Sequence, residues 1–181
     1  MYGIDILVEE HKNILKFVAY VKNMCCDVLE GKDLKTQSFR DCIDFGRNYA
    51  DKHHHAKEEK ILFRIMLEKL GLPAEKLIRS GMLVEHDLGR FHLRQLEEAL
   101  DKYDREPKTE TKLDIVSNAA GYAALLIRHI DKEDAAAYTF AERMLSDEDK
   151  KRVDDETKQF ESDSEEIELN KKYMNWLHSI L

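Results

Sequence analysis

Hydrophobic residues recur every three or four positions along most of the chain, which is the spacing of one face of an α-helix. The first segment holds Ile4, Leu7, Val8, Ile14, Leu15, Val18, Val21, Val28 and Leu29 at this spacing. We predict a first helix over about residues 4–29, ended by Gly31. Glycine suits that position because it adopts the left-handed conformation that closes many helices.

Three more long helices are predicted, with glycine or proline in the turns between them. They cover about residues 37–70, 74–104 and 109–145. A Ser80-Gly81 pair in the third segment indicates a break there, or a later start of that helix. Four long helices joined by short turns predict an all-α fold, an up-down-up-down four-helix bundle.

The last part of the chain predicts a helical extension packed on this bundle. Ser146 is followed by three acidic residues, which is typical of a helix N-terminus, and a polar helix to about residue 162 is expected. The hydrophobic residues there are too numerous for a free tail. They are Phe160, Ile167, Tyr173, Trp176, Leu177, Ile180 and Leu181. We therefore expect a bundle at 1–145 and a C-terminal helical extension at 146–181.

The composition agrees with a helical, cytoplasmic protein. The chain has two prolines, seven glycines and 36% charged residues. Its net charge of −8 argues against nucleic acid and anionic membrane as partners, and no apolar run is long enough to span a bilayer. The N-terminus lacks the features of a signal peptide, and Cys25, Cys26 and Cys42 form no metal-type or redox pair.

Two histidine–glutamate pairs carry the candidate chemistry. His54 with Glu58, and His129 with Glu133, are each four residues apart, so each pair shares one face of a helix. A lone histidine in an apolar run precedes each pair by 43 residues; these are His11 and His86. A duplicated set of two histidines and one glutamate is what a two-metal site requires.

The predicted turns bring these histidines to one height. The midpoint of His11 and His54 is 32.5, that of His86 and His129 is 107.5, and that of His54 and His86 is 70. All three midpoints fall in or beside predicted turns, so the four histidines form one layer, with both glutamates about 6 Å beyond it on the same side. A single buried histidine is more often a hydrogen-bonded core residue. Six buried polar groups without a metal would cost several kcal/mol, which favours a metal site.

The ligand types favour iron, with manganese or zinc as possible substitutes. Imidazole and carboxylate without thiolate suit these ions, and neither a Cys-rich tetrahedron nor an HExxH motif is present. His53 and His55 should point about 100° to either side of His54, so we expect them at the rim or between helices. His92 and His178 are not expected to be ligands either. Glu59 and Glu85 are expected to support the ligands or lie on the surface.

The motifs resemble those of the hemerythrin-like (HHE cation-binding) family over about residues 1–145. They are His11, His54-x-x-x-Glu58 followed by Glu59-Lys60-Ile61-Leu62-Phe63, Glu85-His86-Asp87, and His129-x-x-x-Glu133. The resemblance implies a non-haem di-iron site in a four-helix bundle, bridged by both glutamates and able to bind dioxygen or a related oxidant. The family's ligand positions fall on His11, His54, Glu58, His86, His129 and Glu133.

Two positions depart from oxygen-carrying hemerythrins. Arg90 stands where those proteins have a further histidine, and they use an Asp five residues after the last histidine, an offset held here by Asp134. Glu133 shares the face of His129 better and matches the HHE pattern. One fewer imidazole favours sensing or redox chemistry over reversible oxygen carriage. Arg90 is expected to leave its iron with an open position or to hold an anion there.

The functional expectation is a module that binds or senses O₂, NO or peroxide. The alternatives are a di-iron redox enzyme, reducing peroxide or NO or repairing iron–sulfur clusters, and an iron storage or buffering protein. The expected partner is a small diatomic or peroxide ligand. A redox partner is possible, but the sequence marks no specific one.

Overall fold

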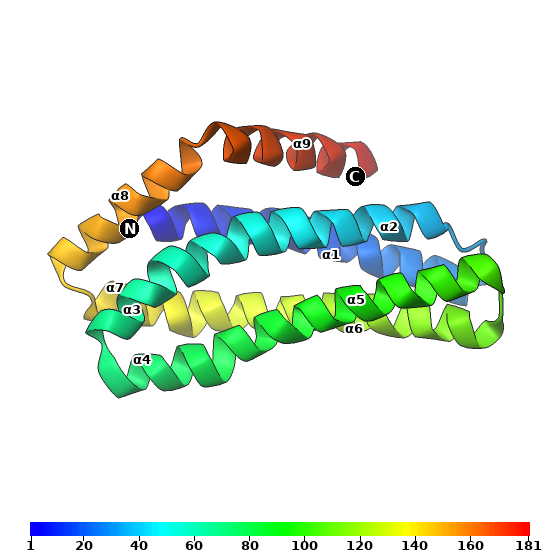
Figure 1. The fold of residues 1–181 in the computed structure, drawn as a ribbon, viewed down its shortest axis with the longest axis horizontal. Coiled ribbons are helices and arrows are strands. Elements are labelled where there is room, and N and C mark those ends of the chain that lie inside the picture. Colours follow the sequence, from blue (N-terminus) through cyan, green and yellow to red (C-terminus); the bar gives the residue numbers. More distant parts are fainter.

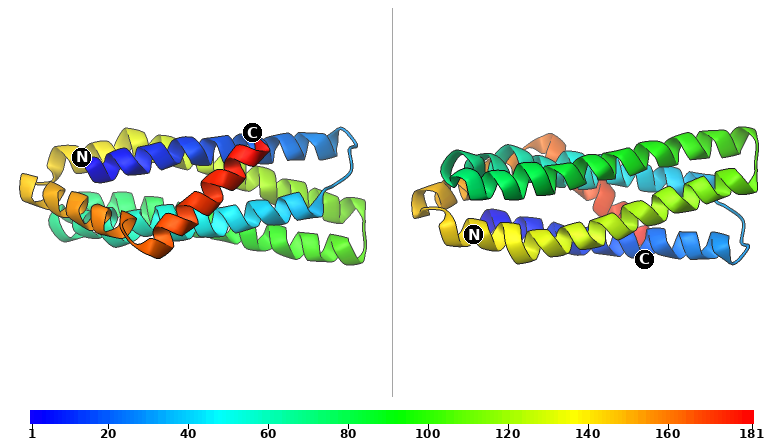
Figure 2. Two further views of the ribbon diagram at one scale, coloured as in Figure 1. Left: turned by 90° about the horizontal axis from the view of Figure 1, so that it is seen from above. Right: turned by 90° about the horizontal axis from the view of Figure 1, so that it is seen from below.

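Four long helical segments lie side by side in the computed structural model, which describes residues 1–181 (Figure 1). The chain has no β-strand, so the predicted all-α class is confirmed. The first segment is α1 (Tyr2–Leu29), and the second comprises α2 (Thr36–Phe45), η1 (Gly46–His55), η2 (Glu58–Leu62) and α3 (Phe63–Lys69). The third comprises α4 (Gly71–Leu77), η3 (Ile78–Met82) and α5 (Leu83–Arg105), and the fourth α6 (Thr109–Lys132), η4 (Glu133–Tyr138) and α7 (Thr139–Met144). Consecutive segments run in opposite directions (Figure 2), which is compatible with the predicted bundle.

Glycines mark two of the turns, as predicted. Gly31, after α1, has φ of 86°, and Gly71, after α3, has φ of 61°. Both values lie in the left-handed region, which side chains with a Cβ rarely adopt. The third segment begins at Gly71 rather than near residue 74, because Pro73 fits the first turn of α4. The predicted break at Ser80-Gly81 is wrong: these residues lie in η3, and the helix continues through it.

The elements labelled η are π-helical turns, in which backbone hydrogen bonds join residues five apart. Three of them lie near the candidate ligands. η1 carries His54, η2 begins at Glu58, and η4 begins at Glu133. The wider turn separates successive side chains by a smaller angle than in an α-helix. Side-chain directions here therefore differ from those that α-helical geometry predicts.

The C-terminal residues form two further helices, α8 (Asp147–Glu161) and α9 (Ser164–Ile180). The Ser146 hydroxyl accepts a hydrogen bond from the Asp149 N–H at 3.1 Å, which confirms the predicted N-cap. α8 packs against α1, and α9 crosses obliquely over α1 and η1 (Figure 2, left). Val153 of α8, and Tyr173 and Leu177 of α9, are buried in these contacts.

The hydrophobic core consists of two clusters separated by a polar layer. One cluster runs from Ile14 in α1 to the end formed by α2 and α5, and the other contains Ile4 and Leu7 with residues of α3 and α7. His11 lies between the two clusters along α1. No helix has both the length and the apolar character needed to cross a lipid bilayer.

Candidate metal centre

The polar layer between the two hydrophobic clusters contains all six predicted ligands. Every one is at most 2% exposed, and every long segment contributes at least one. One group of potential ligand atoms, mutually within 4.8 Å, comes from His11, His54, Glu58 and Glu133. A second group, within the same limit, comes from His55, Glu58, His86 and His129. Glu58 belongs to both groups, which places it between them.

The distances between ligand atoms suit coordination of a common ion. His129 Nε2 lies 3.1 Å from Glu133 Oε1, and His11 Nε2 lies 3.3 Å from Glu133 Oε2. The two oxygens of Glu133 thus face histidines of different groups. His86 Nε2 lies 3.5 Å from Glu58 Oε2. Two ligands bonded at about 2.1 Å and at right angles are about 3 Å apart, so the side chains already converge at nearly that spacing.

The hydrogen-bond inventory of the core tests whether these residues fit a metal. Buried polar atoms in folded proteins nearly always have a partner, because desolvating them is costly. Six buried side-chain atoms of this chain have none, and all six belong to predicted ligands. They are His54 Nε2, His86 Nε2, His129 Nε2, Glu58 Oε2 and both carboxylate oxygens of Glu133. The donor set therefore fits a cation bound in this layer.

A carboxylate is within hydrogen-bond distance of Nδ1, here called the outer nitrogen, of each predicted histidine ligand. The Nδ1 atoms lie 2.7 to 3.0 Å from carboxylate oxygens, in the pairs His11–Asp134, His54–Glu10, His86–Glu59 and His129–Glu85. An Nδ1–H that donates to a carboxylate leaves the Nε2 lone pair directed to the metal. This is the usual outer arrangement around metal-bound histidine, and it occurs here four times.

The carboxylates that bind Nδ1 follow the same repeat along the chain as the predicted ligands. Glu10 directly precedes His11 and Glu85 directly precedes His86, and each binds the histidine 44 positions later. The expected supporting role of Glu59 and Glu85 is thus what the structure shows, whereas sequence reasoning missed Glu10. Asp134, the alternative to Glu133, lies on the outer side of His11, and its side chain is 41% exposed. Glu133 occupies the interior.

Burial and mutual repulsion shift the pKa values of the Glu58 and Glu133 carboxyl groups. Burial, together with the negative charge of Glu133, raises the pKa of Glu58 well above its ordinary value. Burial opposes ionisation of Glu133 too, but the neighbouring imidazole of His129 keeps the pKa of Glu133 well below its ordinary value. Burial lowers the pKa of His54 to about 4, so this imidazole is neutral at pH 7. A cation between the two carboxylates would relieve their repulsion.

Tyr138, which sequence reasoning missed, is a further polar residue of the layer that contains the predicted ligands. Its hydroxyl donates a hydrogen bond to Glu58 Oε1 at 2.6 Å and lies 3.3 Å from His11 Nε2. Its ring stacks on His11 with 5.4 Å between centroids. Tyr138 closes η4, the same π-helical turn that presents Glu133. That shared turn brings both side chains into the layer.

The structure contradicts the expectation that His53 and His55 lie at the rim. Both are buried, with exposures of 0% and 6%. The physical reason is η1, because its wide turns bring successive side chains onto one broad inward face. His53 Nδ1 pairs with Glu166 of α9 at 2.6 Å, whereas His55 joins the group that contains His86.

A buried lysine connects the polar layer to the C-terminal extension. Lys57 is 1% exposed, and its ammonium donates to Glu10 and to Glu161 of α8 and lies 3.1 Å from His53 Nε2. Glu10, His53 and Glu161 could otherwise resemble a metal site. The ammonium already occupies the centre of that group. Because Glu10 also holds His54, Glu161 of the extension is connected to the candidate centre through two residues, Lys57 and Glu10.

The guanidinium of Arg90 pairs with carboxylates of the chain, and the expectation of an open iron position or a bound anion there stays a prediction. Its guanidinium is bound by Asp51 at 2.7 Å, by Glu59 at 2.7 Å and by Asp87 at 3.0 Å. These carboxylates engage the guanidinium outside the ligand layer. Arg90 thus acts on the centre only through the residues that it binds.

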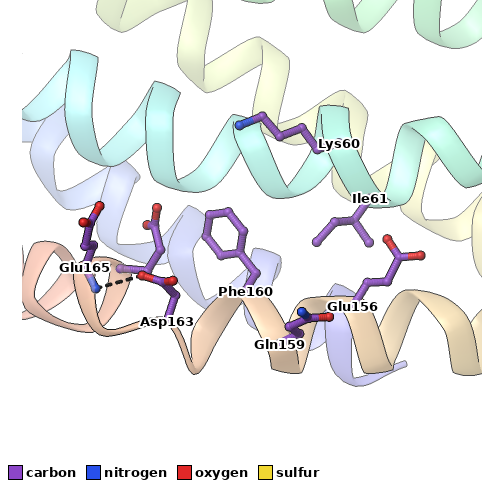
Figure 3. Close-up of a pocket in the computed structure, with 8 residues that line it drawn as sticks. Lys60, Ile61, Glu156, Gln159, Phe160, Asp163 and Glu165 are labelled. Atoms are coloured by element: carbon purple, nitrogen blue, oxygen red, sulfur yellow. Dashed lines mark hydrogen bonds between the residues drawn. The ribbon is translucent and has the colours of Figure 1, made fainter.

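A surface cavity of about 680 Å³ lies between η2 and the junction of α8 with α9 (Figure 3). The Phe160 ring projects into it from α8. None of the six predicted ligands lines this cavity. Its lining residues are Lys60, Ile61, Glu156, Gln159, Phe160, Asp163, Glu165 and Glu166.

Comparison with known protein families gives a match over most of the chain. The family model described as hemerythrin HHE cation binding domain matches residues 2–141, which include most of the chain and all six predicted ligands. No curated protein and no solved structure matches the chain.

Proposed function

The chain belongs to the hemerythrin HHE cation-binding domain family, and on that premise we propose that it holds two non-haem iron ions and binds or senses O₂, NO or peroxide. The unpartnered atoms of the polar layer carry this proposal, because all six belong to predicted ligands. A bound cation would give these atoms partners, and imidazole with carboxylate suits iron better than a structural zinc site. Manganese or zinc could substitute.

In the proposed centre two histidines would hold each ion, and both glutamates would contribute to the two ions. His11 and His54 would hold one ion, and His86 and His129 would hold the other. Glu58 and Glu133 are each close to histidines of both groups, which supports their bridging role. The supporting scaffold is a four-helix bundle at 1–145, with 146–181 as an extension. A cytoplasmic location stays a prediction from the three unpaired cysteines.

Iron in this setting supplies a redox-active coordination position for a small ligand. The residues of the chain provide a dry environment and fix the orientation of the ligands. The two hydrophobic clusters above and below the layer exclude water. The outer carboxylates keep the proton on Nδ1 of each histidine and fix the ring orientation. The Tyr138 hydroxyl orients Glu58.

A di-iron redox enzyme, acting on peroxide or NO or in iron–sulfur cluster repair, is the second candidate. The observation that favours it is Tyr138, which places a phenolic hydroxyl inside the layer, hydrogen-bonded to Glu58. Iron storage or buffering is the third possibility. It differs from the other two in that stored iron must be released readily.

The proposal is tested by loading the protein with Fe(II) anaerobically and adding O₂, NO or hydrogen peroxide in separate titrations. We expect an optical change that saturates near one small ligand per pair of irons for at least one of them. Sustained consumption of peroxide or NO with added reductant would identify the enzyme instead. Rapid loss of iron to a chelator would identify storage. The His54→Ala variant is the matched control without the intact centre.

A further inference from the structure

We propose that His55 is a seventh ligand of the metal centre, an imidazole on the His86–His129 side that Asp51 and Arg90 hold in position. This inference rests on the proposed metal centre and deepens it. Neither the repeated motifs nor their spacing assigns His55 any role, because the pattern that repeats in the two halves of the chain contains only His54 and Glu58 in this helix.

The position of His55 carries the first part of the argument. Its potential ligand atom and those of Glu58, His86 and His129 lie within 4.8 Å of one another. The His55 ring stacks on the His86 ring with 3.7 Å between centroids and 5° between planes. The His129 ring lies 5.7 Å away, edge-on. Three imidazoles from three different segments of the chain therefore meet beside one carboxylate.

The outer nitrogen of His55 is bound in the same way as those of the other histidines. Nδ1 of His55 pairs with Asp51 Oδ1 at 3.2 Å, one helical turn earlier in the chain. The hydrogen bond that a carboxylate accepts from Nδ1 fixes the tautomer with a free lone pair on Nε2. No hydrogen bond of the structure involves Nε2 of His55. A carboxylate thus binds Nδ1 of a fifth histidine beside the layer, in addition to the four predicted histidine ligands.

Arg90 supplies the second part of the argument, because it locks this pair to the neighbouring helix. Its Nε and Nη2 lie 2.9 and 2.7 Å from Asp51 Oδ1. Nη2 also lies 2.7 Å from Glu59 Oε1, and Glu59 holds His86. One guanidinium therefore positions two stacked imidazoles, His55 and His86. Arg90 stands where oxygen-carrying hemerythrins have a further histidine, so here that helix contributes a positioning residue while the adjacent helix contributes the imidazole.

If His55 only filled space, its replacement would have a different effect on the protein. Replacing it would lower the stability of the metal-free protein but leave the affinity for iron unchanged. A ligand behaves in the opposite way, because its loss weakens metal binding however well the chain folds. The two roles are separated by measuring iron affinity and metal-free stability on the same variants.

The test uses the full-length protein loaded anaerobically with Fe(II), and it compares wild type with His55→Ala, His55→Gln and His92→Ala. His92 pairs with Asn118 away from the polar layer, so it is the matched histidine control. In competition with a chelator we expect both His55 variants to lose at least one iron about tenfold more readily than wild type. His92→Ala should match wild type. X-ray absorption should show five imidazoles per iron pair in wild type and four in His55→Ala.

A cavity variant with chemical rescue makes the test sharper. His55→Gly leaves space for free imidazole at the same position. We expect added imidazole to restore the iron affinity of His55→Gly and to leave that of His92→Ala unchanged. Circular dichroism of the metal-free variants checks that each one folds. If a variant does not fold, the imidazole count of wild-type protein alone still decides the question.

A variant of Asp51 tests separately whether this carboxylate positions His55. Asp51→Asn keeps the shape of the side chain but removes the charge that orients His55. We expect it to weaken iron binding, and we expect no further weakening when it is combined with His55→Ala, because both act through one ligand. Additive effects would show that Asp51 acts elsewhere.

Two outcomes separate this inference from the function on which it rests. Wild-type protein that binds no iron pair would overturn the proposed function. Wild-type protein that binds two irons, with four imidazoles and with affinity unchanged by His55→Ala, would overturn the role of His55 and leave the proposed function standing.

Discussion

Lys57 connects α1, η1 and α8, so its replacement should destabilise the fold strongly. Lys57→Met keeps the length of the aliphatic stem and removes the ammonium. That ammonium is bound by Glu10 and Glu161, whose side chains are 6% and 21% exposed. The variant therefore leaves two carboxylates facing each other with little water to solvate them.

The expected loss is about 3 kcal/mol, at the lower end of the range for breaking a buried ion pair by removing one partner. The lower end applies because Glu161 keeps some contact with solvent. A loss of about 1.4 kcal/mol changes an equilibrium constant tenfold, so the folding equilibrium should fall more than a hundredfold. Exposed ion pairs, by contrast, contribute about 0–1 kcal/mol.

The effect should depend on pH. Burial would raise the pKa of Glu10, but its hydrogen bonds with His53 and His54 and the charge of Lys57 hold that pKa well below its ordinary value. A lowered pKa in the folded state stabilises the protein above the unfolded pKa of about 4.3, and the contribution is lost as the pH falls through the folded value. The difference between wild type and Lys57→Met should therefore be full above about pH 5 and should shrink in more acidic solution.

Urea unfolding of the metal-free proteins, followed by circular dichroism, measures this difference. Lys60→Met is the matched control, because Lys60 is exposed and the charge change is the same. Adding Glu10→Gln to Lys57→Met should recover part of the loss, since it removes one of the stranded carboxylates. Equal stability of Lys57→Met and Lys60→Met at pH 7 would refute the reasoning.

Three further predictions concern the layer and the extension. Tyr138→Phe should cost the metal-free protein about 1–3 kcal/mol in urea unfolding, because Glu58 Oε1 loses its donor, while two irons still bind; unchanged stability would show that this hydrogen bond contributes nothing. Glu85→Gln should weaken iron binding in chelator competition by about 10–100-fold through its effect on His129. Glu98 is exposed on the same helix, α5, and Glu98→Gln should leave iron binding unchanged; equal affinities of the two variants would contradict the supporting role of Glu85. Truncation after residue 145 should lower the thermal unfolding temperature but preserve iron stoichiometry, and loss of iron would instead make the extension part of the centre.

The spacing of residues along the chain predicted much of the architecture, because the height of a residue in a helical bundle depends on how many residues separate it from the nearest turn. The turns at Gly31 and Gly71 could be read from residue type, since few other residues adopt their backbone conformation. With the turns placed, the heights of His11, His54, His86 and His129 followed. The structure does bring His11 beside His54, with 4.7 Å between ring centroids, and His86 beside His129, with 4.8 Å. Whether these residues ligate iron stays a prediction.

Local helix geometry could not be predicted in the same way. The expectation for His53 and His55 assumed an α-helix, whereas η1 has wider turns and buries both rings. No residue type in that stretch signals a π-helical turn. Glu10 and Asp134 were missed as supporting residues for another reason. Each lies next to a predicted ligand but reaches a histidine on a different segment, and such pairs become visible only once the segments are docked.

The number of iron ions bound per chain tests the central claim most directly. The metal-free protein is loaded with Fe(II) under anaerobic conditions, freed of excess iron by gel filtration, and analysed for iron and protein. The two groups of buried ligand atoms predict two irons per chain, and they predict a clear loss of iron in His54→Ala and in His129→Ala. A wild-type ratio of one or none, or full retention of two irons by both variants, would contradict the proposed centre.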